Sequence, residues 1–451
     1  MFVKDKEFYK TVARLVIPIT LQNVMSLLLN MMDTVMLGQM SERSEEAISA
    51  ANLANQPFFV FTLFLFGMIS GATVLISQYW GKNDRKSINA VCGIAMTAAL
   101  TIGVIFTAVC IIFTLPVMGL FTDSPSVIRI GASYLRIVAI SYIPAAITSL
   151  LCGIMKAVEH VKIILFTNSM AIVINIILNY ILIFGKFGAP AFGVQGAAIA
   201  TLISRLIELT MVLIFVFGIE KQLRLRIGDM MKITKPLVQD FIRYSSPVIF
   251  NETVWGLGIT FHAAIIGHLG EEAYAAYTIT NVIERVGQLA AMGFANAAAI
   301  IIGKELGAGH NSKVYGYAKT LMIMSTGLGL ITSAVVWIIH MPVSQFFNVA
   351  DSTRAMTHSI IFFYIFFNVC KYFNCLNIVG ILRGGGDTVA AMLCDFLPMW
   401  FFCIPLGFIA AFYFKLPVQY VYAVLVCDEA LKIPFGFARF KSKKWIKNIT
   451  R

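Results

Sequence analysis

Long apolar segments recur along the whole chain, and each ends at a short break that contains polar residues, glycine or proline. A helix needs about 20 apolar residues to cross the ~30 Å hydrocarbon core of a bilayer. A membrane β-barrel is not favoured, because its strands alternate apolar and polar residues over ~10 positions. The segments therefore predict an all-α integral membrane protein with twelve transmembrane helices, centred near residues 25, 67, 103, 142, 174, 205, 252, 290, 328, 369, 401 and 426.

The net charge of +12 is distributed unevenly between the two sides of the predicted membrane. With the N-terminus inside, the breaks on its side carry most of the lysines and arginines, as in GIEKQLRLRIGDMMKITKP. The opposite breaks carry acids, as in SERSEEA and GEEAY. This asymmetry follows the positive-inside rule. It predicts cytoplasmic termini, with the lipid bilayer, and not nucleic acid, as the partner of the basic segments. We expect the protein in the plasma membrane of a prokaryotic cell.

Motifs of enzymes and cofactor sites are missing from the sequence. The eight cysteines fall in or beside apolar segments, without the spacing of a disulfide framework or a zinc site. The six histidines show no HExxH spacing, and no GxxxxGK[ST] loop occurs. We therefore expect neither a cofactor nor an enzymatic activity.

The chain repeats itself at about half its length. EEAISAANLAN at residues 45–55 corresponds to EEAYAAYTITN at 271–281, and Pro18 corresponds to Pro247 at nearly the same offset. Each half has six predicted helices, so the halves are parallel repeats related by an axis along the membrane normal, around a central cleft. The predicted parts are an N-lobe at 1–217 (helices 1–6), a cytoplasmic basic linker at 218–236, a C-lobe at 237–438 (helices 7–12) and a cytoplasmic basic tail at 439–451.

Asp33 lies in the first apolar segment, and the aligned position of the second half is His262. Ionisable side chains inside a membrane are costly and commonly functional. Asn175 and Asn179 of the fifth segment are four residues apart, on one helix face and ~6 Å apart along the axis. Their amide groups suit a cation or a carboxyl group. We predict an Na+ or H+ coupling site from Asp33, Asn175 and Asn179, with structural hydrogen bonds between helices as the alternative.

The second half carries more charge within its apolar segments. Such charges face the protein interior or a wet cavity and are paired. We predict that they form a substrate or coupling site, with a static salt-bridge network as the alternative. Adjacent residues cannot share one helix face, so the pair at 284 and 285 ranks below the others. The candidates are Glu252, Lys371, Asp395, Glu284 and Arg285.

Two other groups of charged residues have the spacing of local pairs on one helix. Arg205 and Glu208 are three residues apart, near the end of the sixth segment. Asp428, Glu429 and Lys432 have a similar spacing in the twelfth. We predict a structural role for both groups.

Several motifs in a fixed order give the chain a resemblance to a known family. They are Pro18 with Asp33, NIILNYILIFGKFGAP, Glu252, GHLGEEAYAAY, GKELGAG and LRGGGDT. In this order they resemble the multidrug and toxic compound extrusion (MATE) transporters over essentially the whole chain. The resemblance implies two lobes of six helices and export of amphipathic, often cationic compounds in exchange for Na+ or H+. It assigns ion coupling to Asp33, Asn175, Asn179 and Glu252.

One position departs from the family pattern. Many sodium-coupled members carry an aspartate in the tenth helix, before the LRG arginine, and Tyr372 stands there in this chain. A second sodium site of that kind is therefore not expected. We expect Lys371 to neutralise Glu252 or Asp395 instead, which leaves ion coupling to Asp33.

Two other functions fit parts of the pattern. A lipid-linked oligosaccharide flippase of the same superfamily would line its cavity with cationic side chains, to meet a pyrophosphate. An integral membrane transferase would need clustered His and Asp residues or metal ligands in its surface loops, which are short here. The acids favour cationic cargo, so we expect an alternating-access antiporter for small amphipathic, cationic substrates. We also expect it to be a monomer.

Overall fold

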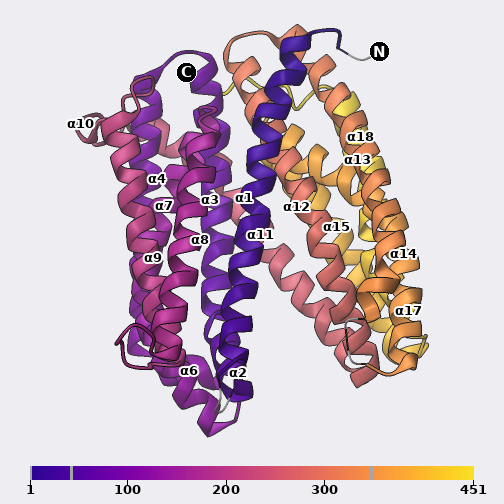
Figure 1. Ribbon diagram of the computed structural model, residues 1–451. Coiled ribbons are helices and arrows are strands. Elements are labelled where there is room, and N and C mark those ends of the chain that lie inside the picture. The colour runs from indigo at the N-terminus through magenta and orange to yellow at the C-terminus, as the bar shows by residue number, and fades with distance from the viewer. Residues whose placement is uncertain (1–2, 41–43, 346, 348, 451) are drawn as a thin grey trace. The chain divides into compact units, whose positions relative to one another are not determined.

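The computed structural model describes residues 3–40, 44–345, 347 and 349–450, with side chains described except at 29–31, 33, 34 and 286. These residues form helices joined by short loops, and no strand occurs among them (Figure 1). Within this part of the chain, 11 helices are long and apolar enough to cross a membrane, one at each of the first eleven predicted segments. The twelfth segment forms two shorter helices, α17 (Val418–Val426) and α18 (Asp428–Lys441), which meet at Cys427. The all-α prediction is confirmed.

The chain folds into two compact units. Unit 1 contains Met1–Thr20, Ser77–Asn83 and Ser246–Arg451, and unit 2 contains Leu21–Ile76 and Asp84–Ser245. Three helices therefore contribute residues to both units, and the first two are α1 (Lys6–Gly38) and α3 (Gln56–Gly81). α11 (Lys235–Gly267) also begins in unit 2 and continues in unit 1.

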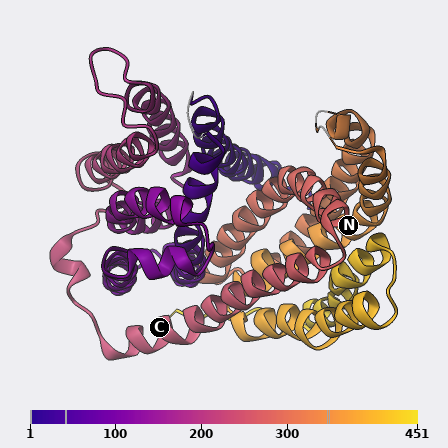
Figure 2. The same cartoon turned by 90° about the horizontal axis from the view of Figure 1, so that it is seen from below.

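Unit 2 is a bundle of the helices of the first half. The N-cap of α4 is Asp84, whose side chain accepts from the backbone N–H of Ser87 at 3.1 Å. α8 ends at Gly185, which takes the left-handed conformation that glycine adopts without strain. α8 and α9 lie side by side in Figure 1 and in Figure 2. The further helices of this unit are α2 (Ser44–Ala54), α4 (Arg85–Ile112), α5 (Thr114–Gly119), α6 (Pro125–Val138), α7 (Tyr142–Ala157), α8 (Val161–Phe184), α9 (Val194–Ile214) and α10 (Ile227–Met230).

The predicted linker at 218–236 is part of unit 2, contains α10 and packs against α4. The backbone N–H of Arg226 donates to Oδ1 of Asn89 on α4 at 2.9 Å. One turn further along α4, the backbone of Met230 lies directly against Gly93, where no side chain separates the two elements. The linker therefore depends on a glycine in α4 for its close approach.

Unit 1 contains the helices of the second half, several of them interrupted by π-helical turns. A π turn adds a residue to the helix and is frequent at functional sites. α13 and α14 pack along each other, as do α12 and η3. The elements are α12 (Glu271–Gly307), α13 (Asn311–Gln345), α14 (Asp351–Cys375), the π turn η3 (Leu376–Arg383), α15 (Thr388–Pro398), the π turn η4 (Met399–Cys403), α16 (Ile404–Phe408), the π turn η5 (Ile409–Tyr413), α17 and α18.

The segment predicted as a basic tail is packed into unit 1. Trp445 is fully buried, and its indole N–H donates to the carbonyl of Phe440 at 2.9 Å. The side chain of Gln78 donates to the carbonyl of Lys447 at 3.1 Å and accepts from the backbone N–H of Ile449 at 2.9 Å. The tail is thus hydrogen-bonded to the end of α3, within the same unit.

Two glycines of α4 provide a matched test of the linker contact. A Cβ at Gly93 would overlap the carbonyl of Met230, whereas a Cβ at Gly103 would meet Ala146 and Ile143 no closer than 3.5 Å, an ordinary contact. We expect Gly93→Ala to lower stability by about 1–3 kcal/mol through overpacking. Gly103→Ala should be neutral or stabilising by up to ~1 kcal/mol, because alanine favours helix. Thermal unfolding in detergent measures both, and equal melting temperatures for the two variants would contradict this packing.

Candidate functional site

A small cavity of about 70 Å³ lies inside unit 1, among α11, α12, α14, η3, α15 and α18. Ionisable side chains from five of these elements reach it, although every element belongs to a predicted membrane span. Charges buried at this depth are stable only when they are paired. The ionisable lining residues are Glu252, Lys371, Arg383, Asp395, Glu429 and Lys432.

Glu252 on α11 pairs with Arg383 at the end of η3. Their charged atoms are 2.8 Å apart, and the side chains are 9% and 2% exposed. Lys371 pairs instead with Glu284 on α12, so the expectation that Lys371 neutralises Glu252 or Asp395 is wrong. The reason is the packing of α14 against α12, which places Lys371 opposite Glu284.

Lys432 on α18 faces three carboxylates. Its ammonium lies 2.7 Å from Asp395, 2.6 Å from Asp428 and 3.7 Å from Glu429. Asp395 also accepts from the amide of Asn251 at 2.9 Å. The prediction of a merely local pair on the twelfth segment is therefore incomplete, because Lys432 joins α18 to α15.

Glu429 has a further partner on α14. The Nδ2 group of Asn374 donates to its carboxylate at 2.9 Å and to its backbone carbonyl at 2.5 Å. Together the contacting groups form one set, here called the charge cluster, with five carboxylates and three basic side chains. The charge cluster consists of Glu252, Glu284, Lys371, Arg383, Asp395, Asp428, Glu429 and Lys432.

In unit 2, the structure brings the two predicted asparagines together. Asn175 and Asn179 are buried on one face of α8, and Nδ2 of Asn179 donates to Oδ1 of Asn175 at 2.9 Å. Nδ2 of Asn175 lies 3.5 Å from the hydroxyl of Thr201 on α9. Asp33 belongs to α1, and its side chain lies outside the described residues. The shared face of the asparagines is confirmed, and their contact with Asp33 stays a prediction.

The remaining predicted residues lie where their positions on the helices place them. Glu284 belongs to the charge cluster, whereas the side chain of Arg285 is exposed on another face of α12. Arg205 and Glu208 pair at 2.9 Å, so that local pair is confirmed.

Sequence reasoning missed two members of the site, Arg383 and Lys432, as partners of acids on other helices. A signal for Lys432 was present, because any lysine in a membrane segment needs a buried acid. The LRGGGDT motif marked Arg383 as a residue of interest but did not indicate which acid it pairs with. Only the packing of η3 near α11 supplies that partner.

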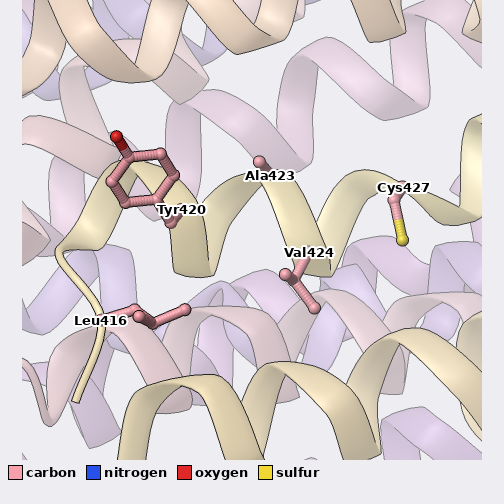
Figure 3. Close-up of a pocket in the computed structure, with 5 residues that line it drawn as sticks. All are labelled: Leu416, Tyr420, Ala423, Val424 and Cys427. Atoms are coloured by element: carbon pink, nitrogen blue, oxygen red, sulfur yellow. The ribbon is translucent and has the colours of Figure 1, made fainter. Parts of the chain in front are cut away.

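A second hollow in unit 1 has a different character. Figure 3 shows Tyr420, Ala423 and Val424 on α17, with Leu416 just before the helix and Cys427 just after it. These residues line an apolar groove of about 510 Å³. Its lining carries no charged side chain, so it offers nothing that recognises an ion.

Known proteins match the chain over nearly its full length. The family model MatE matches residues 18–181 and 247–409, and each match begins at a proline of the internal repeat, Pro18 or Pro247. "Probable multidrug resistance protein NorM" of Thermotoga maritima is 26% identical over 446 residues, which cover 98% of this chain and 94% of that protein. "Probable multidrug resistance protein YoeA" of Bacillus subtilis is 23% identical and covers 98% of this chain and 96% of that protein.

A solved structure has the same fold. It is titled "Outward-facing conformation of a multidrug resistance MATE family transporter of the MOP superfamily", and it superimposes with a TM-score of 0.87 at 17% identity. The alignment covers 98% of this chain and 99% of that one. The predicted fold class is thereby confirmed.

The buried pair of Glu252 and Arg383 gives a test of the charge cluster. Arg383→Met leaves a carboxylate without its partner, and breaking such a pair costs about 3–5 kcal/mol. Glu252→Gln in the same chain should restore part of that loss, because the uncompensated charge is then gone. The control is Arg354→Met, whose exposed pair with Asp351 contributes at most about 1 kcal/mol. Melting temperatures in detergent decide, and an Arg383→Met protein as stable as the control would exclude a buried pair.

Proposed function

Because the chain belongs to the MatE family, whose model matches more than half of it, we propose that it is a secondary active antiporter. Its substrates are amphipathic, cationic organic compounds, which it exports by alternating access in exchange for H+ or Na+. Relatives named as multidrug resistance proteins support drug export. The protein acts as a monomer in the plasma membrane, with both termini in the cytoplasm.

The observation that carries this proposal is the sign of the charge cluster. Its five carboxylates outnumber its three basic groups, in a region from which water is largely excluded. Such an environment favours cations and disfavours anions such as a lipid pyrophosphate. The field of this net acidic interior attracts cations and repels anions near the C-lobe, although the cavity itself is too small for a drug. It therefore supports export of cations over the flipping of anionic glycolipids.

Asp33 is the proposed switch of the N-lobe. A proton or Na+ at its carboxyl group would weaken the binding of a cationic drug, and the drug would weaken ion binding by the same factor, since coupling is reciprocal. One-for-one exchange of monovalent cations moves no net charge across the membrane. The ion's concentration gradient then drives export, and a tenfold gradient, worth about 1.4 kcal/mol, supports a tenfold drug gradient.

Asp33→Asn should abolish export, because the amide cannot release and regain a proton or hold Na+ as an anion does. The measurement is loss of a cationic dye from proteoliposomes with a pH gradient or an Na+ gradient imposed separately. The control is Asp229→Asn on the exposed linker, whose pair with Lys232 lies outside both proposed sites. Export by Asp33→Asn at the rate of this control would refute the switch. Export that needs neither gradient would refute antiport.

A further inference from the structure

We propose that Glu429 of α18 and Asn374 of α14 form a second cation site, which takes one Na+ or one proton. The inference rests on the proposed function, since the bound cation would be a coupling ion. It differs from the site implied by the family resemblance, which centres on Glu252 and an aspartate that is absent here. Three features of unit 1 support it.

The first feature is where the surplus negative charge lies. Glu252 has Arg383 and Glu284 has Lys371, so these two pairs are balanced. Both surplus charges therefore fall on the group around Lys432, where one ammonium serves three carboxylates. α17 ends one residue before α18 begins, so the opposite helix ends that meet there offset little of this charge. More than one negative charge remains, and a buried charge of that size must bind a cation or be protonated.

Glu429 is the least neutralised of the three carboxylates. Lys432 lies 2.7 Å from Asp395 and 2.6 Å from Asp428 but 3.7 Å from Glu429. Asp395 has the amide of Asn251 as a further donor, and Glu429 has the amide of Asn374. The weaker ion pair leaves Glu429 as the carboxylate at which an added cation is stabilised most.

The second feature is an unused oxygen beside this carboxylate. Asn374 is 3% exposed and lines the cavity, and its Nδ2 group is engaged by both the carboxylate and the carbonyl of Glu429. Its Oδ1 atom accepts no hydrogen bond from any residue that the structure describes. A buried amide oxygen without a donor costs about 1–3 kcal/mol. A hard cation such as Na+ would be coordinated by this oxygen, and a protonated water would donate a hydrogen bond to it.

The third feature is the size of the cavity that Glu429 and Asn374 share. Its volume of about 70 Å³ admits a small ion with a few waters. Pockets for drug-sized molecules have volumes of ~300 Å³ or more. The occupant suited to this cavity is therefore an inorganic cation and not the exported compound.

Other charged and titratable groups face Glu429 from the elements that pack on α18. They determine whether an added cation is tolerated, and the basic ones among them are already paired with other acids. The groups that share the cavity with Glu429 are Glu252 of α11, Lys371 and Cys375 of α14, Arg383 of η3, Asp395 of α15 and Lys432 on α18 itself, where Asp428 pairs with Lys432.

The test is performed on full-length protein with Asp33→Asn, which removes the proposed N-lobe contribution. We compare three proteins: Asp33→Asn alone, Asp33→Asn with Glu429→Gln, and Asp33→Asn with the matched control Glu208→Gln. Glu208 is a buried carboxylate paired with Arg205 in unit 2. One arm measures binding of radioactive Na+ to purified protein at fixed pH. The other arm measures protons taken up when the pH of a sodium-free solution is lowered from about 8 to about 6, above the range in which unperturbed carboxylates titrate.

We expect Glu429→Gln to weaken Na+ binding about tenfold or more, or to remove about one proton from the uptake curve. Loss in the first arm identifies Na+ as the occupant, and loss in the second alone identifies the proton. Glu208→Gln should change neither arm. If Glu429→Gln matches the control in both arms, the proposal is overturned.

Two further variants guard against misfolding. Glu429→Asp keeps the charge and should retain binding, whereas Asn374→Leu keeps the volume, removes the oxygen and should weaken it. Loss of binding in Glu429→Asp as well, in protein that elutes normally on size exclusion, counts against a charge-based site. The assay measures binding only, so failed dye export with intact cation binding would refute the proposed function and leave this site standing.

Discussion

The ion pairs of Lys432 are the interactions on which the site of unit 1 depends. The ammonium of Lys432, between α15 and α18, compensates carboxylates whose mutual repulsion would otherwise destabilise this buried site. The other two pairs of the charge cluster are balanced one to one. The imbalance is thus confined to a single place in the unit. A buried imbalance of charge is stable only when a proton or a cation compensates it.

The helical framework was predictable because the bilayer limits the possible structures so strongly. Each of the first eleven apolar segments forms a helix of the required length, and the family model matches the two halves separately. The break at Cys427 was not predicted, because an apolar run carries no mark of an interruption one residue long. The packing of Trp445 in a segment rich in lysine was likewise invisible to a count of charges.

Within the site, contacts along one helix were predictable and most contacts between helices were not. The spacing of Asn175 and Asn179 placed them correctly on one helix face, because four residues make about one turn, but it did not predict the hydrogen bond between them. The partner of Lys371 was predicted wrongly. Arg383 ends the π turn η3, and each residue added by a π turn rotates the following side chains by about 100°. Periodicity in the sequence does not reveal such a shift, so the partner of Glu252 required the structure.

The hydrogen bonds of Gln78 with the chain near its C-terminus bear on the order of biosynthesis. Gln78 and Lys447 are separated by 369 positions, and both belong to unit 1. Large proteins generally fold from the N-terminus as they are made. The end of α3 therefore leaves the ribosome long before its partners exist, and its buried polar side chain must wait for them. Completion of unit 1 is a late, post-insertion event, in which the residues around Trp445 close a structure begun with the first helices.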